Sequence, residues 1–176
     1  MFVGGIIMSK WDKGLDYEST YTRLLRKINT IKNNKTRCYF IIALIQLRNG
    51  SRISEAIRSF KEWVRSNKNE LYIRVSKKRK TEERLMIIPS EAEPYRLQCI
   101  DLLDLNDNVL RDRVRAILYY YFKINTHSLR YAFISYLLRS GVNPALVSKL
   151  IRHSRLDTLL HYVQAKESDN ILRKMG

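Results

Sequence analysis

A helix that is apolar on most of its sides is the feature of this sequence that most constrains the fold. It spans about residues 36–47, where Tyr39 and Phe40 precede the apolar run 42–45. Such a helix offers little polar surface to water, so other elements must enclose it. A chain of 176 residues is long enough to build one compact domain around it. We therefore expect a helical domain with residues 36–47 at its centre.

Amphipathic helices are predicted on both sides of the central helix. Residues 18–31 carry apolar side chains at the i, i+3, i+4, i+7 spacing of one helix face, at Tyr21, Leu24, Leu25 and Ile28. The Asn49-Gly50 pair breaks the chain after the central helix. Ser51 is a suitable N-cap and predicts a third helix to about Val64. Residues 1–18 are expected to form a flexible leader before a domain over 19–176.

The apolar pattern changes from helical to alternating after the third helix. Leu71, Ile73 and Val75 alternate with other residues, and a second apolar stretch covers 85–88 before Pro89. We interpret the two stretches as the strands of a β-hairpin with a strongly basic tip. A basic tip has no role in a core, so it is free to reach a ligand, although many such turns are simply solvated. Its predicted polyanion-binding residues are Lys77, Lys78, Arg79 and Arg84.

The last part of the chain is predicted to be helical. We expect helices over about 108–122, 126–141 and 144–151, and a final helix from Ser154 that carries Tyr162. Gly141 suits the end of a helix, and Asn143 with Pro144 supplies an N-cap and a first-turn proline. Ser154 with Asp157 resembles a capping box. The fold class that follows is mostly α with a small antiparallel β-hairpin.

The net charge narrows the partners that such a domain can bind. Lysine and arginine total 33 against 17 acidic residues, which gives +16 at neutral pH. An excess of this size repels itself unless a polyanion is near, and nucleic acid or an anionic membrane surface could supply one. No segment has the length and purity of a transmembrane helix or the pattern of a signal peptide. Nucleic acid is therefore the favoured partner, and no membrane is expected.

The two cysteines form no paired motif and have no metal-ligand spacing. Cys38 lies in the apolar helix, so we expect it to be a buried thiol. Nothing in this usage calls for an oxidising compartment. We expect a cytoplasmic, nucleoid-associated protein, in the host cytoplasm if the chain is viral.

Chemistry is predicted for the C-terminal third, where all three histidines lie. His127 and Arg130 are three residues apart at the start of a helix, so they share one face. Arg130 is close to the apolar residues of that helix, and a guanidinium there needs an anionic partner. A phosphate suits it, because guanidinium can bind two oxygens at once. His153 and Tyr162 follow in order, and this ordered set carries more weight than any single member.

The ordered set resembles the catalytic boxes of the tyrosine recombinase family. Residues 127–141, HSLRYAFISYLLRSG, are similar to the family's H-x-L-R-H-x-F-A-T-x-L-L-x-x-G, and residues 147–153 are similar to V-x-x-L-L-G-H. Asp157 and Thr158, followed by Tyr162, resemble T-T-x-x-Y. Upstream, residues 49–55 resemble T-G-x-R-x-x-E, and the hairpin resembles the strand pair that carries the family's lysine. The resemblance covers roughly residues 36–164.

The resemblance implies a catalytic domain that cuts and rejoins DNA without metal, cofactor or ATP. It implies a role in catalysis for Arg52, Lys80, His127, Arg130, His153 and Tyr162. Tyr162 would be the nucleophile and form a 3′-phosphotyrosyl link, with Glu55 orienting the site. Lys78 is the alternative to Lys80 as the catalytic lysine. The chain departs from the family pattern at Arg152, where a glycine is usual, and at Tyr131, where histidine is common.

The sequence supports one leading functional hypothesis and three alternatives. The leading one is a site-specific recombinase or integrase, archaeal or viral, that acts on double-stranded DNA as a tetramer and can be monomeric when free. The first alternative is a type IB topoisomerase, which rejoins the same strand. A non-catalytic DNA-binding remnant of an integrase is the second, and a membrane-surface protein is the least favoured. The family's N-terminal DNA-binding domain is expected to be absent, since too few residues precede the matched region.

Overall fold

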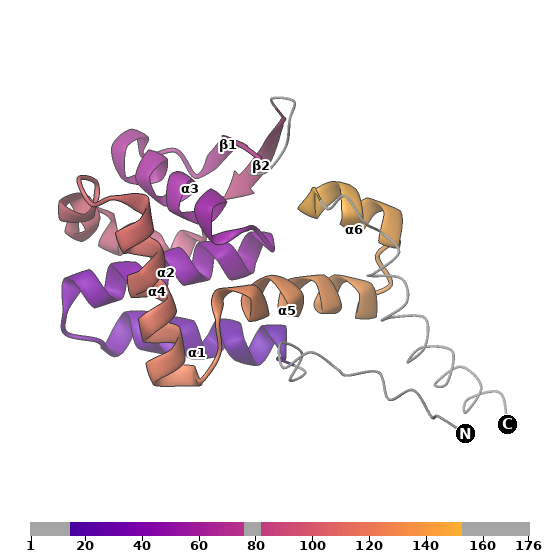
Figure 1. Cartoon of the computed structure of the whole chain (residues 1–176), viewed down its shortest axis with the longest axis horizontal. Coiled ribbons are helices and arrows are strands. Elements are labelled where there is room, and N and C mark those ends of the chain that lie inside the picture. The colour runs from indigo at the N-terminus through magenta and orange to yellow at the C-terminus, as the bar shows by residue number, and fades with distance from the viewer. Residues whose placement is uncertain (1–14, 76–81, 153–176) are drawn as a thin grey trace, which may run out of the picture.

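The computed structural model describes residues 15–75 and 82–152, which form a helical body with a β-hairpin at one end (Figure 1). The expected fold class, mostly α with a small antiparallel hairpin, is confirmed. In chain order the elements are α1 (Tyr17–Thr30), α2 (Asn34–Asn49), α3 (Ile53–Ser66), β1 (Glu70–Arg74), β2 (Glu83–Ile87), the 3-10 helix η1 (Ser90–Leu102), α4 (Asp107–Phe122), α5 (Thr126–Arg139) and α6 (Pro144–Ile151). The predicted final helix with Tyr162 lies outside the described residues.

The apolar helix α2 is the centre of the fold, as predicted. Every side chain from Cys38 to Leu47 is buried. The helix contacts α1, α3, α4, α5, η1 and β2, which together enclose it. It ends at Gly50, whose φ of 54° is the left-handed conformation that glycine adopts without strain. A second apolar cluster joins α5 to α6 through Phe133, Ile134, Leu138, Val147 and Ile151.

The start of α3 differs from the prediction. Ser51 does not cap this helix: it lies one residue before the N-cap position, and its backbone N–H donates to the carbonyl of Gln46 (3.2 Å) in the turn that ends α2. Arg52 occupies the N-cap position instead. Its backbone N–H donates to the Glu55 carboxylate (3.1 Å), which provides the helix start with a side-chain partner. The turn between α2 and α3 therefore leads directly into Arg52.

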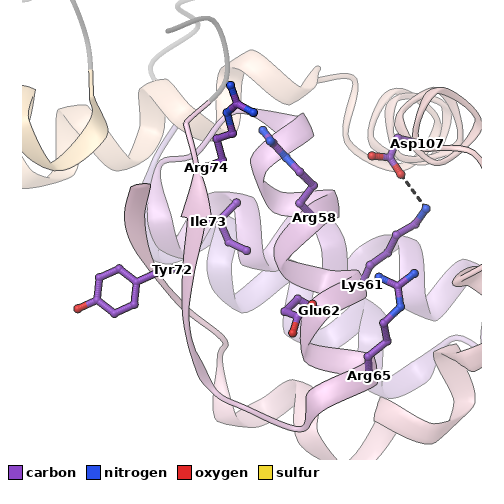
Figure 2. Close-up of a pocket in the computed structure, with 8 residues that line it drawn as sticks. All are labelled: Arg58, Lys61, Glu62, Arg65, Tyr72, Ile73, Arg74 and Asp107. Carbon is purple, nitrogen blue, oxygen red and sulfur yellow. Dashed lines mark hydrogen bonds and ion pairs between the residues drawn. The ribbon is translucent and has the colours of Figure 1, made fainter. Parts of the chain in front are cut away.

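The hairpin pairs β1 with β2 in antiparallel register, with Leu71 opposite Met86 and Ile73 opposite Arg84. Figure 2 shows Ile73 turned toward α3 and Tyr72 turned away from it. Because directly opposed residues share a face, Arg84 also points inward. It is 3% exposed, so the prediction that Arg84 contacts a polyanion from the basic tip is wrong. Lys77, Lys78, Arg79 and Lys80 lie outside the described residues.

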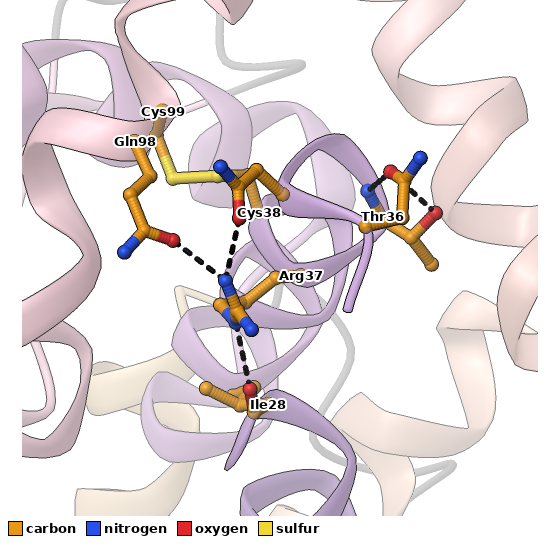
Figure 3. Close-up of a disulfide and its surroundings, with 8 residues drawn as sticks. Ile28, Thr36, Arg37, Cys38, Gln98 and Cys99 are labelled. Atoms are coloured by element: carbon orange, nitrogen blue, oxygen red, sulfur yellow. Dashed lines mark hydrogen bonds between the residues drawn. A yellow bond between two sulfur atoms is a disulfide. The ribbon is translucent and has the colours of Figure 1, made fainter. Parts of the chain in front are cut away.

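A disulfide joins Cys38 of α2 to Cys99 of η1 (Figure 3). The expectation that Cys38 is a free buried thiol is therefore wrong. The sequence separation of 61 between the two cysteines gives no sign of their proximity, which arises only when η1 packs on α2. Beside the disulfide, Arg37 donates to the carbonyl of Ile28 (2.9 Å) and to Gln98 (2.6 Å), which ties α1, α2 and η1 together.

None of the helices in the described ranges is both long and apolar enough to cross a membrane.

Candidate functional site

Two arginines from distant segments meet at the turn that ends α2. Arg84 of β2 donates from Nη2 to the carbonyl oxygen of Asn49 (2.6 Å), and Arg130 of α5 donates from Nη1 to that of Gly50 (2.6 Å). Carbonyls at a helix C-terminus lack intrahelical partners and carry partial negative charge. The end of α2 is therefore a natural anchor for cations.

Glu55 is the carboxylate of this cluster. Its side chain is completely buried. One carboxylate oxygen pairs with Nη1 of Arg52 (3.1 Å), and the other pairs with Nη1 of Arg84 (3.4 Å) and accepts the backbone N–H of Arg52. A buried carboxylate is stable only when its charge is neutralised, so Glu55 fixes both arginines. Its position in the first turn of α3, three residues after Arg52, makes this contact a direct result of helix geometry.

Arg130 is 6% exposed and holds two helix ends at once. Besides Gly50, it donates from Nη2 to the carbonyl of Ile151 at the end of α6 (3.0 Å). Burial, and then the positive charge of nearby Arg52, lowers the pKa of Arg130 to about 10. Arg130 therefore remains a cation at neutral pH. Burial and positive neighbours lower the pKa of Arg130, and the negative charge of Glu55 offsets only part of that lowering.

Arg152 adds a further cation next to this cluster. It has a left-handed backbone (φ 52°) just after α6, and its Nη2 donates to the carbonyl of Glu83 (3.3 Å). Burial lowers the pKa of Arg84, Glu55 opposes that shift, and the charges of Arg52 and Arg152 add to it. Arg152 thus lies close enough to act electrostatically on Arg84. It also links the end of α6 to the hairpin, and Figure 1 shows both at the end of the molecule where α2 stops.

We call Arg52, Arg84, Arg130 and Arg152 the arginine centre. Glu55 is the carboxylate that pairs with two of these guanidinium groups. The cluster places four guanidinium groups around one carboxylate, and a phosphate would suit this excess of positive charge because guanidinium groups bind phosphate oxygens in pairs. Arg52 offers the route to a ligand, since 24% of its side chain is exposed. No cluster of three or more His, Cys, Asp or Glu side chains within residues 15–75 and 82–152 is placed to hold a metal ion.

The structure brings together three of the predicted site residues, Arg52, Glu55 and Arg130. His127 is exposed in the first turn of α5, three residues before Arg130. Lys80, His153 and Tyr162 lie outside the described residues. Sequence reasoning missed the inward role of Arg84. Its position opposite Ile73 reveals that role, but only once the strand register is known.

A basic groove runs along α3 beside the hairpin and has a volume of about 420 Å³ (Figure 2). Its lining residues are Arg58, Lys61, Glu62, Arg65, Tyr72, Ile73, Arg74 and Asp107. The Nζ of Lys61 donates to the Asp107 carboxylate and to the carbonyl oxygen of Leu105, both at 2.7 Å. Arg65 and Arg74 are exposed, and Arg58 and Arg74 extend toward the same end of the groove. The groove therefore presents cations to solvent from α3 and from the hairpin that also carries Arg84.

No protein-family model matches the chain. The chain is 36% identical over 175 residues to "Putative integrase ORF241" of Acidianus two-tailed virus, covering 98% of this chain and 71% of the viral protein. It is 33% identical over 163 residues to "Putative integrase V10" of Sputnik virophage, covering 76% of this chain and 69% of that protein.

A solved structure shares the fold. The XerH site-specific recombinase, bound to its difH substrate in a pre-cleavage complex, matches 90% of this chain with a TM-score of 0.59 and 21% sequence identity. The present chain spans about half the length of that recombinase (52%).

Proposed function

Because this chain belongs to the tyrosine recombinase family, we propose that it is the catalytic core of a site-specific recombinase or integrase that cuts and rejoins DNA. The observation that carries the proposal is the meeting of Arg52 and Arg130 around one buried carboxylate, at the end of the central helix. These are the two arginines that the family resemblance assigns to phosphate binding. Their proximity is what a shared scissile phosphate requires.

The proposed reaction begins with attack of Tyr162 on a DNA phosphorus. The phenolic oxygen forms a bond to phosphorus, the bond to the 5′ oxygen breaks, and a 3′-phosphotyrosyl link remains. A phenol has a pKa near 10, so it must lose its proton during attack. The phosphorus gains charge on its non-bridging oxygens, and Arg52 and Arg130 would hold those oxygens in fixed geometry. One such group is typically worth ~3–4 kcal/mol at the barrier.

The remaining proposed groups handle protons. Lys80 would protonate the departing 5′ oxygen as general acid, with Lys78 as the alternative. His127 and His153 would donate hydrogen bonds to the phosphate or accept the proton of Tyr162. Because the phosphotyrosyl bond conserves the energy of the phosphodiester, rejoining needs no ATP. In this proposal neither cleavage nor rejoining uses a metal ion or a cofactor.

Double-stranded DNA is the proposed substrate. The net charge of +16 and the basic groove along α3 support it, because cations that neutralise phosphates release counterions and favour binding. Lys77, Lys78 and Arg79 would add contacts from the hairpin. Integration of a viral or archaeal element, by four protomers on two duplexes, is the biological role we propose.

One experiment separates the proposal from its two alternatives. The protein is incubated with supercoiled plasmid and with two differently labelled duplexes that carry candidate sites. Joining of one label to the other supports a recombinase. Relaxation without exchange of labels would point to topoisomerase-type activity. DNA binding that is salt-dependent but produces no cleavage of either substrate would favour a non-catalytic remnant.

A further inference from the structure

We infer that Arg84 is a positioning residue that leaves Arg52 free to bind phosphate, by taking up half of the Glu55 carboxylate. The inference rests on the proposed function, because it assigns a role within that site. It adds an arginine that the family boxes do not include, on the strand that follows the basic hairpin tip.

The geometry divides the two oxygens of Glu55 between two arginines. One oxygen faces Nη1 of Arg52 at 3.1 Å, and the other faces Nη1 of Arg84 at 3.4 Å. A carboxylate can also bind a single guanidinium with both oxygens, in the parallel two-bond arrangement. Arg84 competes with that arrangement. The remaining donors of Arg52, whose side chain is partly exposed, are then available to an incoming phosphate.

Burial makes the competition strong. Glu55 is completely buried, so its charge needs a close cation. Without Arg84, Arg52 would neutralise a larger share of that charge and would turn toward Glu55. Arg84 is itself 3% exposed and held at the carbonyl of Asn49, so it cannot leave Glu55 to follow a ligand. It thus acts as the fixed cation, and Arg52 acts as the accessible one.

Arg84 is poorly suited to a purely stabilising role. Its Nε is buried and has no hydrogen-bond partner among the described residues. A buried donor without a partner is unfavourable, and uncharged residues in place of both Arg84 and Glu55 would avoid that penalty without leaving a lone buried charge. The charge at this position is therefore better explained by what it does to Glu55 and Arg52.

The test uses inorganic phosphate as a probe of the arginine centre, without DNA. Phosphate is titrated calorimetrically into the wild-type chain and into Arg130→Ala, and the binding that disappears in Arg130→Ala is taken as the signal of the centre. The same titration is made on Arg84→Met, on the charge-balanced double variant Arg84→Met/Glu55→Gln, and on Lys35→Ala, an exposed cation at the start of α2, as the matched control. Circular dichroism checks that each variant is folded.

We expect phosphate affinity to fall about tenfold or more in Arg84→Met, the loss of roughly one charge-assisted hydrogen bond. It should recover at least partly in the double variant, because Glu55→Gln removes the charge that captures Arg52. Lys35→Ala should leave this signal unchanged. The double variant also serves if Arg84→Met alone does not fold, since it leaves no unpaired carboxylate. Near wild-type affinity in that variant then supports the inference.

A purely structural Arg84 gives a different result. If it only anchors the hairpin to Asn49, Glu55→Gln cannot restore phosphate binding, and a double variant that is folded but still weak overturns the inference. Absence of an Arg130-dependent signal in the wild-type chain also overturns it. Phosphate binding that follows the expected pattern, without any protein–DNA adduct on cleavable DNA, would count against the proposed function and leave the role of Arg84 standing.

Discussion

Arg130 donates a hydrogen bond of 2.6 Å to the carbonyl oxygen of Gly50, which joins α5 to the turn at the end of the central helix. Arg52 follows Gly50 by two residues, so the same backbone segment carries Arg52 and accepts the hydrogen bond of Arg130. Glu55 then fixes Arg52 from the first turn of α3. The candidate site is thus assembled on the best-buried part of the fold.

Gly50 should tolerate no side chain. A Cβ built there would lie 2.2 Å from the ring of Phe133, and the φ of 54° disfavours other residues. We expect Gly50→Ala to lower the free energy of unfolding by about 3 kcal/mol, from roughly 1 of backbone strain and the rest from overpacking. Gly141→Ala is the matched control, because its φ of 80° is also left-handed but its surroundings are open. Urea unfolding should show a loss of only about 1 kcal/mol there. Equal losses in the two variants would contradict this packing.

Arg130 should not be replaceable by lysine. A lysine ammonium is a single point donor and cannot span the carbonyls of Gly50 and Ile151 as the guanidinium fork does. We expect Arg130→Lys to slow single-turnover cleavage of a nicked DNA substrate by about a hundredfold or more, the effect of losing one positioned donor. Arg65→Lys, in the groove, should stay within about twofold. An Arg130→Lys protein that cleaves at the wild-type rate would refute the role assigned to this fork.

Much of this fold could be predicted from the sequence because burial follows periodicity. The apolar run at residues 36–47, the alternation at 71–75 and the Asn143-Pro144 start each appear as predicted. Side-chain direction on β2 was harder. The sequence predicts Arg84 as part of the basic tip, and only its pairing with Ile73 in the sheet shows that its side chain is buried.

Long-range contacts account for the rest. The Cys38–Cys99 disulfide and the η1 helix depend on the packing of distant segments, which local patterns do not report. Ser51 is a similar case, because the turn that ends α2 includes its N–H and α3 begins one residue later than its capping preference indicates. Arg52 and Arg130 were predicted as partners by family resemblance, and their proximity comes from the packing of α2, α3 and α5.

The groove along α3 should contribute to DNA affinity without contributing to sequence preference. Charge reversal in Arg65→Glu or Arg74→Glu should weaken binding to any duplex and reduce the slope of log affinity against log salt by about 1 each. Lys35→Glu, an exposed cation at the start of α2, is the matched control and should have a smaller effect. Fluorescence anisotropy over a salt series measures both quantities. Equal losses in all three variants would mean that only net charge matters.

The disulfide should stabilise the fold. It joins two buried cysteines with a sequence separation of 61, and such links typically contribute about 2–4 kcal/mol. We expect reductant to lower the guanidinium unfolding midpoint of the wild-type chain. The Cys38→Ser/Cys99→Ser variant should already be less stable and should not respond to reductant. A wild-type midpoint that is the same with and without reductant would contradict this expectation.

The most direct test of the central claim is covalent trapping on DNA. The chain is incubated in EDTA with a labelled duplex that carries a nicked candidate site, then denatured and resolved on a gel beside Tyr162→Phe and the control Tyr120→Phe, an exposed tyrosine of α4. We expect a protease-sensitive adduct in the wild-type chain and in Tyr120→Phe, and none in Tyr162→Phe. An adduct that persists in Tyr162→Phe, or one that forms only when a divalent metal is supplied, would contradict it.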